Sequence, residues 1–299
     1  IATERQMFTI ESLNVNNYGL NALNFGLYRG STVYLNLLID NGIGSGTAFN
    51  AIKDGTELPL NNVTVRLRNS ANTIVIGENI SSLDGGVRLW IPHTYNNQTV
   101  RLQSDILDGY LLVSNLIGTQ AGTITTATAV FNFTTVSGNN YTGSALGFVL
   151  KSTFVASMEK IATAGSEIQF SHTFRANAPG SISLSATQVN SPVLPGWSYQ
   201  FFNDTNKNLS IDIGESQITT PIVVTANQEI FIIAKIVVPS NAPIGGSSLT
   251  ELTLIHTYTG SIPLVTSNLQ LTDLVSVNED GSAGLELIKS ADKLTASPG

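Results

Sequence analysis

The sequence contains no cysteine and few charged residues, and both shortages limit what the protein can be. Without cysteine, disulfides, zinc–thiolate sites and cysteine nucleophiles are excluded. Charged residues make up 12 % of the chain, against roughly 25 % in ordinary soluble domains. Serine, threonine, asparagine and glycine take their place. Neutral polar side chains suit a surface that packs against copies of itself or lies in an exposed layer.

Basic clusters and long apolar runs are also missing. The formal net charge is -7, whereas nucleic-acid binding needs a basic surface that displaces counterions. The sequence therefore predicts no nucleic-acid partner, and the same argument disfavours an anionic membrane surface. The best apolar run, residues 230–239, is interrupted by Lys235 and is too short to cross a bilayer. No signal-peptide pattern follows Ile1, so we expect the sequence to begin after any signal peptide.

Alternation of apolar and polar residues, the period of a β-strand, dominates the chain. Each alternating run is bounded by Asn, Gly, Pro or Asp, the residues that make turns. The runs recur about every ten residues, as in two packed antiparallel sheets. The length of 299 residues and the 42 % of hydrophobic residues allow two cores. The sequence thus predicts an all-β protein of tandem antiparallel β-sandwich domains, and its clearest strands are residues 62–68, 86–91, 181–186 and 251–256.

A short internal repeat bears on the domain organisation. Residues 159–165 (Glu-Lys-Ile-Ala-Thr-Ala-Gly) resemble residues 292–299 (Asp-Lys-Leu-Thr-Ala-Ser-Pro-Gly) when one gap is allowed. Each copy follows an apolar strand pattern, and the two are separated by about the length of a sandwich domain with insertions. We therefore expect a further repeat to begin at residues 285–299.

Four features connect the second half of the chain to a known family. They are the Lys160–Gly165 opening, the Pro195-Gly196-Trp197 strand entry, the acidic loop at 204–215, and the strand exit from Val237 to Gly245. With them, the segment from about 152 to 299 resembles the "domain of unknown function 11" repeats of large bacterial and archaeal surface proteins. The resemblance implies an Ig-like sandwich with a coat, stalk or adhesin role and no enzymatic activity.

The first half is similar to prealbumin-like sandwich modules of surface adhesins, over about residues 30–118. The similarity rests on the runs 58–67, 84–89 and 108–111. Relatives of this kind include some that form lysine–asparagine isopeptide bonds. Here the region's only lysine, Lys53, lies in a turn-like Lys-Asp-Gly sequence, so we expect no such bond. The predicted organisation is an N-terminal strand segment (1–28), a prealbumin-like sandwich (29–120), an Ig-like surface-repeat sandwich (121–284) and the start of a further repeat (285–299).

The acidic loop carries the clearest chemical pattern. Counted from Asp204, side-chain oxygens occur at the first, third, fifth, seventh, ninth and twelfth positions, which is the ligand spacing of a twelve-residue calcium loop. Leu209 stands where helix–loop–helix sites have glycine. The alternative is a turn held by its own asparagine and aspartate side chains. We expect a structural calcium ion bound by Asp204, Asn206, Asn208, Ser210, Asp212 and Glu215.

No other group of residues suggests chemistry. His93, His172 and His256 fall on different predicted strands without metal-ligand spacing, and we expect them to be solvated or on strand faces. Asp105 and Asp108 are too close together before a turn to suggest a glycosidase pair. The glycines of residues 42–46 precede no helix, so a turn is expected rather than a phosphate site.

These observations predict a non-enzymatic structural module of an extracellular surface layer, stalk or filament, which assembles with copies of itself or with neighbouring repeats. Residues 7–15 alternate like a strand. They fit either the first strand of the first domain or a strand donated to a neighbour. An alternative function is an adhesin or carbohydrate-binding module that recognises a host or cell-surface glycan. Such a module would present aromatic side chains, and the two tryptophans, Trp90 and Trp197, lie in strand patterns typical of a core.

Overall fold

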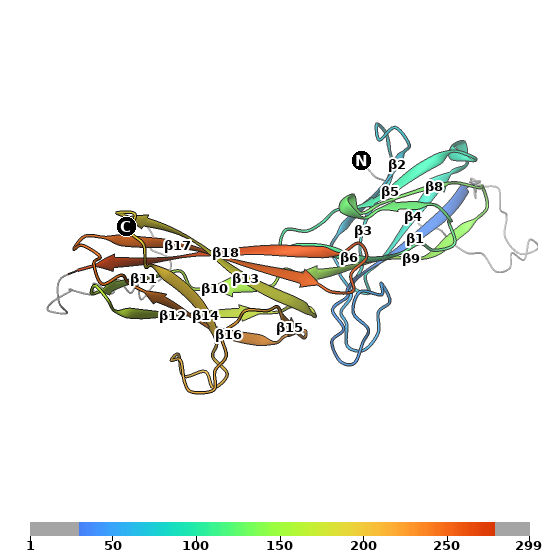
Figure 1. The fold of residues 1–299 in the computed structure, drawn as a ribbon. Coiled ribbons are helices and arrows are strands. Elements are labelled where there is room, and N and C mark those ends of the chain that lie inside the picture. Colours follow the sequence, from blue (N-terminus) through green and yellow to red (C-terminus); the bar gives the residue numbers. More distant parts are fainter. Residues whose placement is uncertain (1–29, 279–299) are drawn as a thin grey trace, which may run out of the picture.

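The computed structural model describes residues 30–278, and nearly all of their regular structure is β-strand (Figure 1). Within this range the only helical elements are two single 3-10 turns, η1 (His93–Tyr95) and η2 (Thr126–Thr128). The all-β prediction is confirmed. The expected N-terminal strand segment and the expected start of a further repeat lie outside the described residues.

The first sandwich consists of two sheets. One has the strand order β4-β1-β9-β6 and the other β3-β2-β5-β8-β7. Their strands are β1 (Gly30–Ile39), β2 (Thr64–Asn69), β3 (Val75–Ile80), β4 (Gly86–Pro92), β5 (Thr99–Ser104), β6 (Tyr110–Leu116), β7 (Thr123–Thr125), β8 (Val130–Thr134) and β9 (Asn140–Leu150).

The second sandwich also has two sheets, with the orders β10-β12-β16-β14 and β11-β18-β17-β13-β15. Its strands are β10 (Thr153–Val155), β11 (Met158–Ala162), β12 (Glu167–Arg175), β13 (Gly180–Ser191), β14 (Ser198–Asn203), β15 (Ile222–Val224), β16 (Glu229–Val237), β17 (Ser247–Tyr258) and β18 (Val265–Val277). Of the four runs predicted from alternation, 62–68 overlaps β2, and the other three fall within β4, β13 and β17.

Alternation builds the two cores. In β17, Thr250 and Leu252 are fully buried, while Glu251 between them is exposed, because successive side chains of a strand point to opposite faces. Each sandwich has its own cluster of buried side chains drawn from both of its sheets. Burying a side chain such as Phe170 or Phe174 contributes about 1.5–3 kcal/mol.

Two strand pairs are parallel, although the prediction was for antiparallel sheets. β1 pairs in parallel with β9, and β11 pairs in parallel with β18. In both sandwiches a strand near the start of the domain pairs with the last strand, and the two run in the same direction. The other pairs are antiparallel.

The division between the sandwiches differs from the boundary expected at residue 120. β7, β8 and β9, which span residues 123–150, pair with strands of the first sandwich. Lys151 and Ser152 then lead directly into β10 of the second sandwich.

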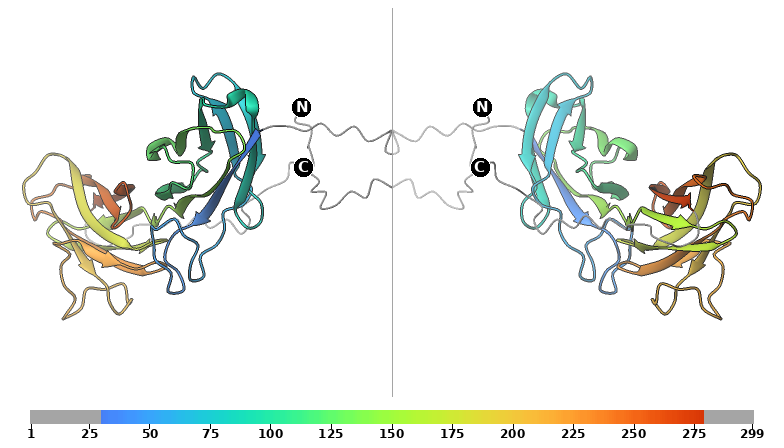
Figure 2. Two further views of the ribbon diagram at one scale, coloured as in Figure 1. Left: turned by 90° about the vertical axis from the view of Figure 1, so that its right-hand side faces the viewer. Right: turned by 90° about the vertical axis from the view of Figure 1, so that its left-hand side faces the viewer.

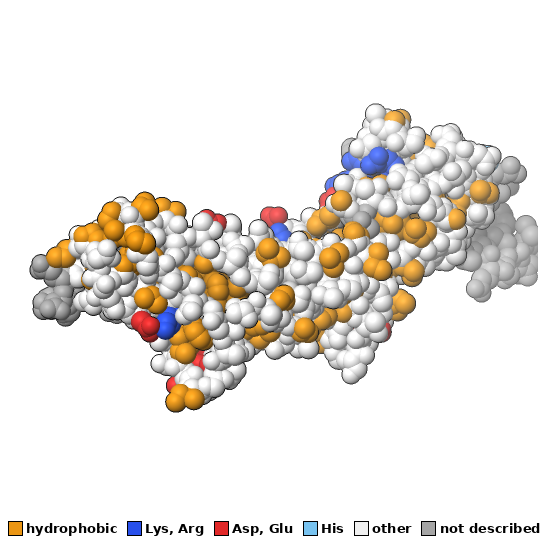
Figure 3. Space-filling model, viewed as in Figure 1, with side chains coloured by type: hydrophobic (Ala, Val, Ile, Leu, Met, Phe, Trp, Pro, Cys, Tyr) orange, Lys and Arg blue, Asp and Glu red, His pale blue; other side chains and the backbone are white. Residues whose placement is uncertain are grey.

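The sandwiches follow one another along an elongated molecule (Figure 1). Seen along this direction, the two sandwiches are turned relative to each other (Figure 2). Most of the surface in view is neutral and polar, with few charged side chains, as the composition predicts (Figure 3). Across residues 30–278 there is no helix with the length and hydrophobicity needed to span a bilayer.

Candidate functional site

The loop predicted to bind calcium projects from the second sandwich below β16 in Figure 1. The sequence pattern predicts strands on both sides of the loop, at residues 197–202 and 217–224. β14 ends just before the loop, as expected. The strand expected after it, at residues 217–224, is reduced to a bridge between Gln217 and Phe202 and to the three residues of β15. The loop is therefore anchored on its N-terminal side by β14 and only loosely by strand pairing on its C-terminal side.

Asp204 organises the first half of this loop. Its carboxylate is 2 % exposed. Oδ1 accepts hydrogen bonds from the backbone N–H groups of Lys207 (2.6 Å) and Asn208 (3.2 Å), and Oδ2 accepts one from Leu209 (3.0 Å). Leu209 has φ +66°, the left-handed conformation that glycine adopts most easily. The backbone thus takes the sharp bend of a calcium loop without the glycine.

The second half is closed by the other two carboxylates. Glu215 accepts hydrogen bonds from the N–H groups of Thr205 (2.9 Å) and Asp212 (3.1 Å). Asp212 Oδ2 accepts from the side-chain amides of Asn206 (2.7 Å) and Asn208 (2.5 Å). Ser210 donates its N–H to Asn208 Oδ1 at 2.9 Å. The six predicted ligands therefore lie in one loop and are linked by hydrogen bonds.

The fit to calcium is partial. Calcium takes six to eight oxygens, whereas two amide nitrogens face Asp212. A half-turn of each amide would present its oxygen instead. In residues 30–278 there is no cluster of three or more His, Cys, Asp or Glu side chains that could hold a metal ion. The loop is stable as a set of turns, and calcium binding to it stays a prediction.

The three histidines lie apart, and two of them are more buried than expected. His93 is exposed, and its Nδ1 lies 2.7 Å from Ser137 Oγ. His172 and His256 are 1 % and 0 % exposed and belong to separate polar contacts inside the second sandwich. The alternation pattern indicates which strand face each occupies, but not how completely the opposite sheet covers it.

The remaining candidates are surface features. Asp105 forms an ion pair with Arg66 at 2.6 Å, and Asp108 is exposed. Ile43 O, inside the glycine-rich stretch, accepts hydrogen bonds from the N–H groups of Gly46 (3.4 Å) and Thr56 (3.0 Å), which is a turn, as predicted.

A second site, which the sequence analysis missed, lies where the two sandwiches meet. We call it the joint, and define it by a shared buried cluster. The first sandwich contributes Phe49, Val113 and Val149, and the second contributes Ala178 and Tyr258. The rings of Phe49 and Tyr258 meet edge to face, with centroids 6.4 Å apart.

Asp40, at the end of β1, holds Phe49 in the joint. Its carboxylate is 0 % exposed, and it accepts hydrogen bonds from the N–H groups of Phe49 (2.6 Å) and Ala51 (2.7 Å) and from the hydroxyl of Ser114. Gly147 is needed beside it, because a Cβ there would overlap both Asp40 and Ser114. The backbone hydrogen bonds compensate the cost of burying the charge.

Hydrogen bonds also cross the joint. Asn41 donates its amide to Asn177 O (3.2 Å), and Ile262 donates its N–H to Val113 O (3.2 Å). Asn115 donates to Ile262 O at 3.4 Å. The joint therefore combines buried apolar contacts with hydrogen bonds between the two sandwiches.

The two-residue linker is fixed as well. Lys151 O accepts a hydrogen bond from the Asn177 amide (2.7 Å), and Ser152 Oγ accepts one from the Asn177 N–H (3.1 Å). Ser152 Oγ also lies 2.9 Å from His256 Nδ1. Burial lowers the pKa of His256 to about 4 and raises that of Tyr258, so both side chains are neutral near pH 7.

The joint has a weak signal in the sequence. Asp40 directly follows the apolar run Leu37-Leu38-Ile39. A charged residue at such a position either lies in a turn or is buried and accepts hydrogen bonds. Two of its partners, Phe49 and Ala51, lie in the irregular loop that follows, and the third, Ser114, lies on β6. Spacing along the chain does not reveal them.

Comparison with solved structures finds pilin and adhesin subunits. The major pilin subunit BcpA of Bacillus cereus is 11 % identical, with TM-score 0.40, over 82 % of this chain and 69 % of that one. The major pilin SpaD of Corynebacterium diphtheriae is 9 % identical, with TM-score 0.29, over 84 % and 66 %. The minor pilin GBS52 of Streptococcus agalactiae is 9 % identical, with TM-score 0.30, over 89 % and 100 %. No family model and no curated protein matches the chain, so the resemblance to "domain of unknown function 11" repeats stays a prediction.

Proposed function

We propose that the chain is a structural module of an extracellular surface layer, stalk or filament. The joint is the observation that carries this proposal. A module that transmits force along a filament needs its domains fixed end to end. Two sandwiches with a shared buried cluster, cross-joint hydrogen bonds and a hydrogen-bonded linker meet that need, whereas interfaces between independently moving domains are more polar.

The distribution of titratable groups supports the same proposal. His172, Asp273 and Tyr199 form the one buried His–carboxylate contact of residues 30–278, and His172 and Asp273 are sealed in the core at 1 % and 0 % exposure. A diffusing substrate has no access to them. The low surface charge further suits packing between copies of the module.

Self-assembly is part of this proposal. Along β18, residues 265–272 pair with β17 on one side, and β11 pairs on the other side only from residue 273 onward. The N–H groups of Val265 and Thr272 donate to serine side chains. Among the described residues, 266–271 therefore form a sheet edge that no second strand pairs with, which is a template for a further strand. Residues 7–15, outside the described range, carry the alternation of a strand that a neighbour could donate.

Electron microscopy of the purified chain at high concentration, with and without calcium, tests the assembly. We expect rods or fibres, and a variant lacking residues 1–15 should keep its far-ultraviolet circular dichroism but form shorter polymers or none. A full-length chain that stays monomeric under all these conditions contradicts the assembly. Assembly of the truncated variant at normal length would instead exclude the donated strand.

Calcium binding to the loop at residues 204–215 is a separate proposal. It is supported by the oxygen spacing and by the left-handed backbone at Leu209. The ion would be bound by Asp204, Asn206, Asn208, Ser210, Asp212 and Glu215. Its role would be to stabilise an exposed loop, since the loop lies far from any group that could react.

A further inference from the structure

The chain contains one Asn-Gly pair, Asn41-Gly42, and it lies at the joint. Gly42 has φ +71° in the loop after β1. Because glycine has no side chain, nothing attached to Gly42 shields its backbone nitrogen from the side chain of Asn41. A short covalent path joins this nitrogen to Cγ of Asn41, and a bond between the two atoms closes a five-membered succinimide ring. The Asn41 side chain can therefore lose ammonia through a reaction with its own main chain.

The amide of Asn41 is buried but only half satisfied. Asn41 is 7 % exposed. Its Nδ2 donates to Asn177 O across the joint at 3.2 Å, whereas its Oδ1 has no hydrogen-bond partner among the residues that the structure describes. Asn41 also lines a cavity of about 200 Å³, whose other walls are Ile39, Tyr110, Leu150, Asn177 and Asn227. This volume admits water, so ammonia has a way out of the site and water a way in.

Glu57 faces the backbone nitrogen of Gly42. Its Oε1 accepts the Gly42 N–H at 2.7 Å, and its Oε2 accepts the Asp54 N–H at 3.3 Å. Glu57 is 3 % exposed. Burial, together with the nearby carboxylates of Asp40 and Asp54, raises the pKa of Glu57. A carboxylate of raised basicity, at hydrogen-bond distance from the proton that has to be removed, has the placement of a general base.

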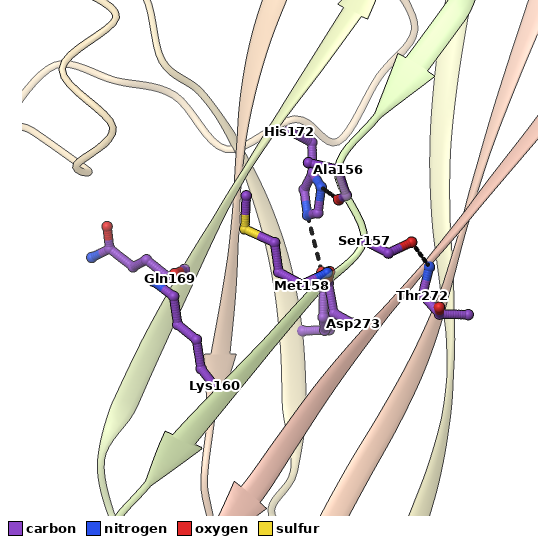
Figure 4. Close-up of polar contacts among 9 residues, drawn as sticks. Ala156, Ser157, Met158, Lys160, Gln169, His172, Thr272 and Asp273 are labelled. Carbon is purple, nitrogen blue, oxygen red and sulfur yellow. Dashed lines mark hydrogen bonds and ion pairs between the residues drawn. The ribbon is translucent and has the colours of Figure 1, made fainter. Parts of the chain in front are cut away.

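The other three buried carboxylates of residues 30–278 have more partners than Glu57. Asp40 and Asp204 each accept three hydrogen bonds. Asp273 lies 3.0 Å from His172 Nε2 (Figure 4). Glu57 has two backbone donors and, within the described part of the chain, no side-chain donor or cation. Of these four carboxylates, Glu57 is therefore the one best able to accept a proton.

We propose that Asn41 is a site of spontaneous deamidation, with Glu57 as the general base. The Gly42 nitrogen attacks Cγ of Asn41 as its proton passes to Glu57 Oε1. The Cγ–Nδ2 bond then breaks, Glu57 returns the proton to the leaving nitrogen, and ammonia departs. Water opens the succinimide at either of its two carbonyl carbons, which leaves aspartate or isoaspartate at residue 41. One amide and one water become one carboxylic acid and one ammonia, and no oxidant or reductant is required.

The product weakens the joint. A carboxylate at residue 41 cannot donate to Asn177 O, so one of the hydrogen bonds between the two sandwiches is lost. The new negative charge directly follows Asp40 in the chain, and like charges held close together in a buried site repel. Isoaspartate also lengthens the main chain between β1 and the loop that carries Phe49. This consequence rests on the rigid joint of the proposed function, whereas the deamidation itself does not.

Peptide mass spectrometry of the full chain, incubated at neutral pH in ¹⁸O-labelled water, tests the deamidation. The peptide that contains residue 41 should gain about 3 Da, the difference between an amide and a labelled carboxylic acid, and should separate into aspartate and isoaspartate forms. Glu57→Gln should slow this gain at least about tenfold, because a positioned general base contributes about 10²–10⁴-fold. Glu159→Gln, at an exposed position of β11, should react at the wild-type rate. Asn41→Gln should show no gain at residue 41.

A wild-type chain that keeps asparagine at residue 41 after weeks of incubation overturns the proposal, and this result does not depend on the folding of any variant. Deamidation of a folded Glu57→Gln chain at the wild-type rate overturns the role of Glu57. The weakening of the joint is measured separately, by double electron–electron resonance between spin labels on the two sandwiches. The distance distribution should be broader in the deamidated chain than in the fresh one. A distribution that stays equally narrow contradicts the weakening, whereas a fresh chain that is already broad contradicts the rigid joint.

Discussion

At the scale of single residues, buried polar side chains define the connections of this molecule. Asp40 accepts hydrogen bonds from Phe49 and Ala51 in the loop after β1 and from Ser114 in β6. These bonds hold Phe49 against the second sandwich. His256, buried beside the linker, is neutral and packs against Tyr258, with ring centroids 4.2 Å apart and the rings tilted by 42°. These groups are intolerant of change because their partners are buried with them.

Replacement of Asp40 should be strongly destabilising. Asp40→Ala leaves two backbone N–H groups and a hydroxyl without their acceptor in a buried site, and each buried donor left unsatisfied costs about 1–3 kcal/mol. Urea denaturation followed by circular dichroism measures this loss. Asp108→Ala, at an exposed position, should change stability by no more than about 0.5 kcal/mol. Equal stability of the two variants would show that Asp40 does not hold the loop.

Because burial lowers the pKa of His256, we expect the folded chain to lose stability in mild acid. Its pKa is about 4 in the folded chain and about 6.5 when unfolded. The unfolded state therefore binds the proton first, so the free energy of unfolding falls as the pH drops from about 6.5 toward 4 and is unaffected by this group above that range.

Urea denaturation at pH 7 and pH 5 measures this effect. The loss on going to pH 5 should be about 1–2 kcal/mol smaller in His256→Gln than in the wild type. His93→Gln, at an exposed histidine, should lose as much as the wild type. If His256→Gln and wild type show the same pH dependence, the histidine is not buried as a neutral group.

At the scale of strands and loops, alternation was a good guide and long-range pairing was not. The runs at 86–91 and 251–256 are strands because one face of each meets a core. The parallel pairs β1–β9 and β11–β18 join strands far apart in sequence, and no local pattern encodes them. The strand expected at 217–224 is mostly absent because pairing with β14 ends at Ile218, whose N–H donates to Phe201 O (2.8 Å), and residues 219–221 belong to no strand.

The loop at residues 204–215 could be located from its oxygen spacing, but spacing does not decide between an ion and hydrogen bonds. If calcium binds, it binds the folded loop preferentially. At a hundredfold excess of calcium over Kd, the free energy of unfolding then rises by about 2.7 kcal/mol, and the thermal midpoint rises with it. Differential scanning calorimetry with and without calcium measures the shift. Asp212→Ala and Glu215→Ala should abolish it and leave the calcium-free chain folded. No calcium-dependent shift in the wild type means that the loop is only a turn.

At the scale of the whole molecule, the number and class of domains followed from length and alternation, while their boundary and their contact did not. The boundary depends on β8 and β9 pairing with strands that lie earlier in the chain, β5 and β1. The joint depends on Phe49 and Tyr258, which are separated by two hundred residues and meet only once both sandwiches have formed. Both features arise from tertiary packing.

The central claim is that the joint makes the two sandwiches one rigid unit. Because the chain has no cysteine, spin labels can be placed at Thr99→Cys in the first sandwich and Ser185→Cys in the second, both exposed strand positions. Double electron–electron resonance should then give one narrow distance distribution, and Phe49→Ala in the same background should broaden it. A broad distribution in the doubly labelled chain with Phe49 intact would mean that the sandwiches move independently, and would contradict the account.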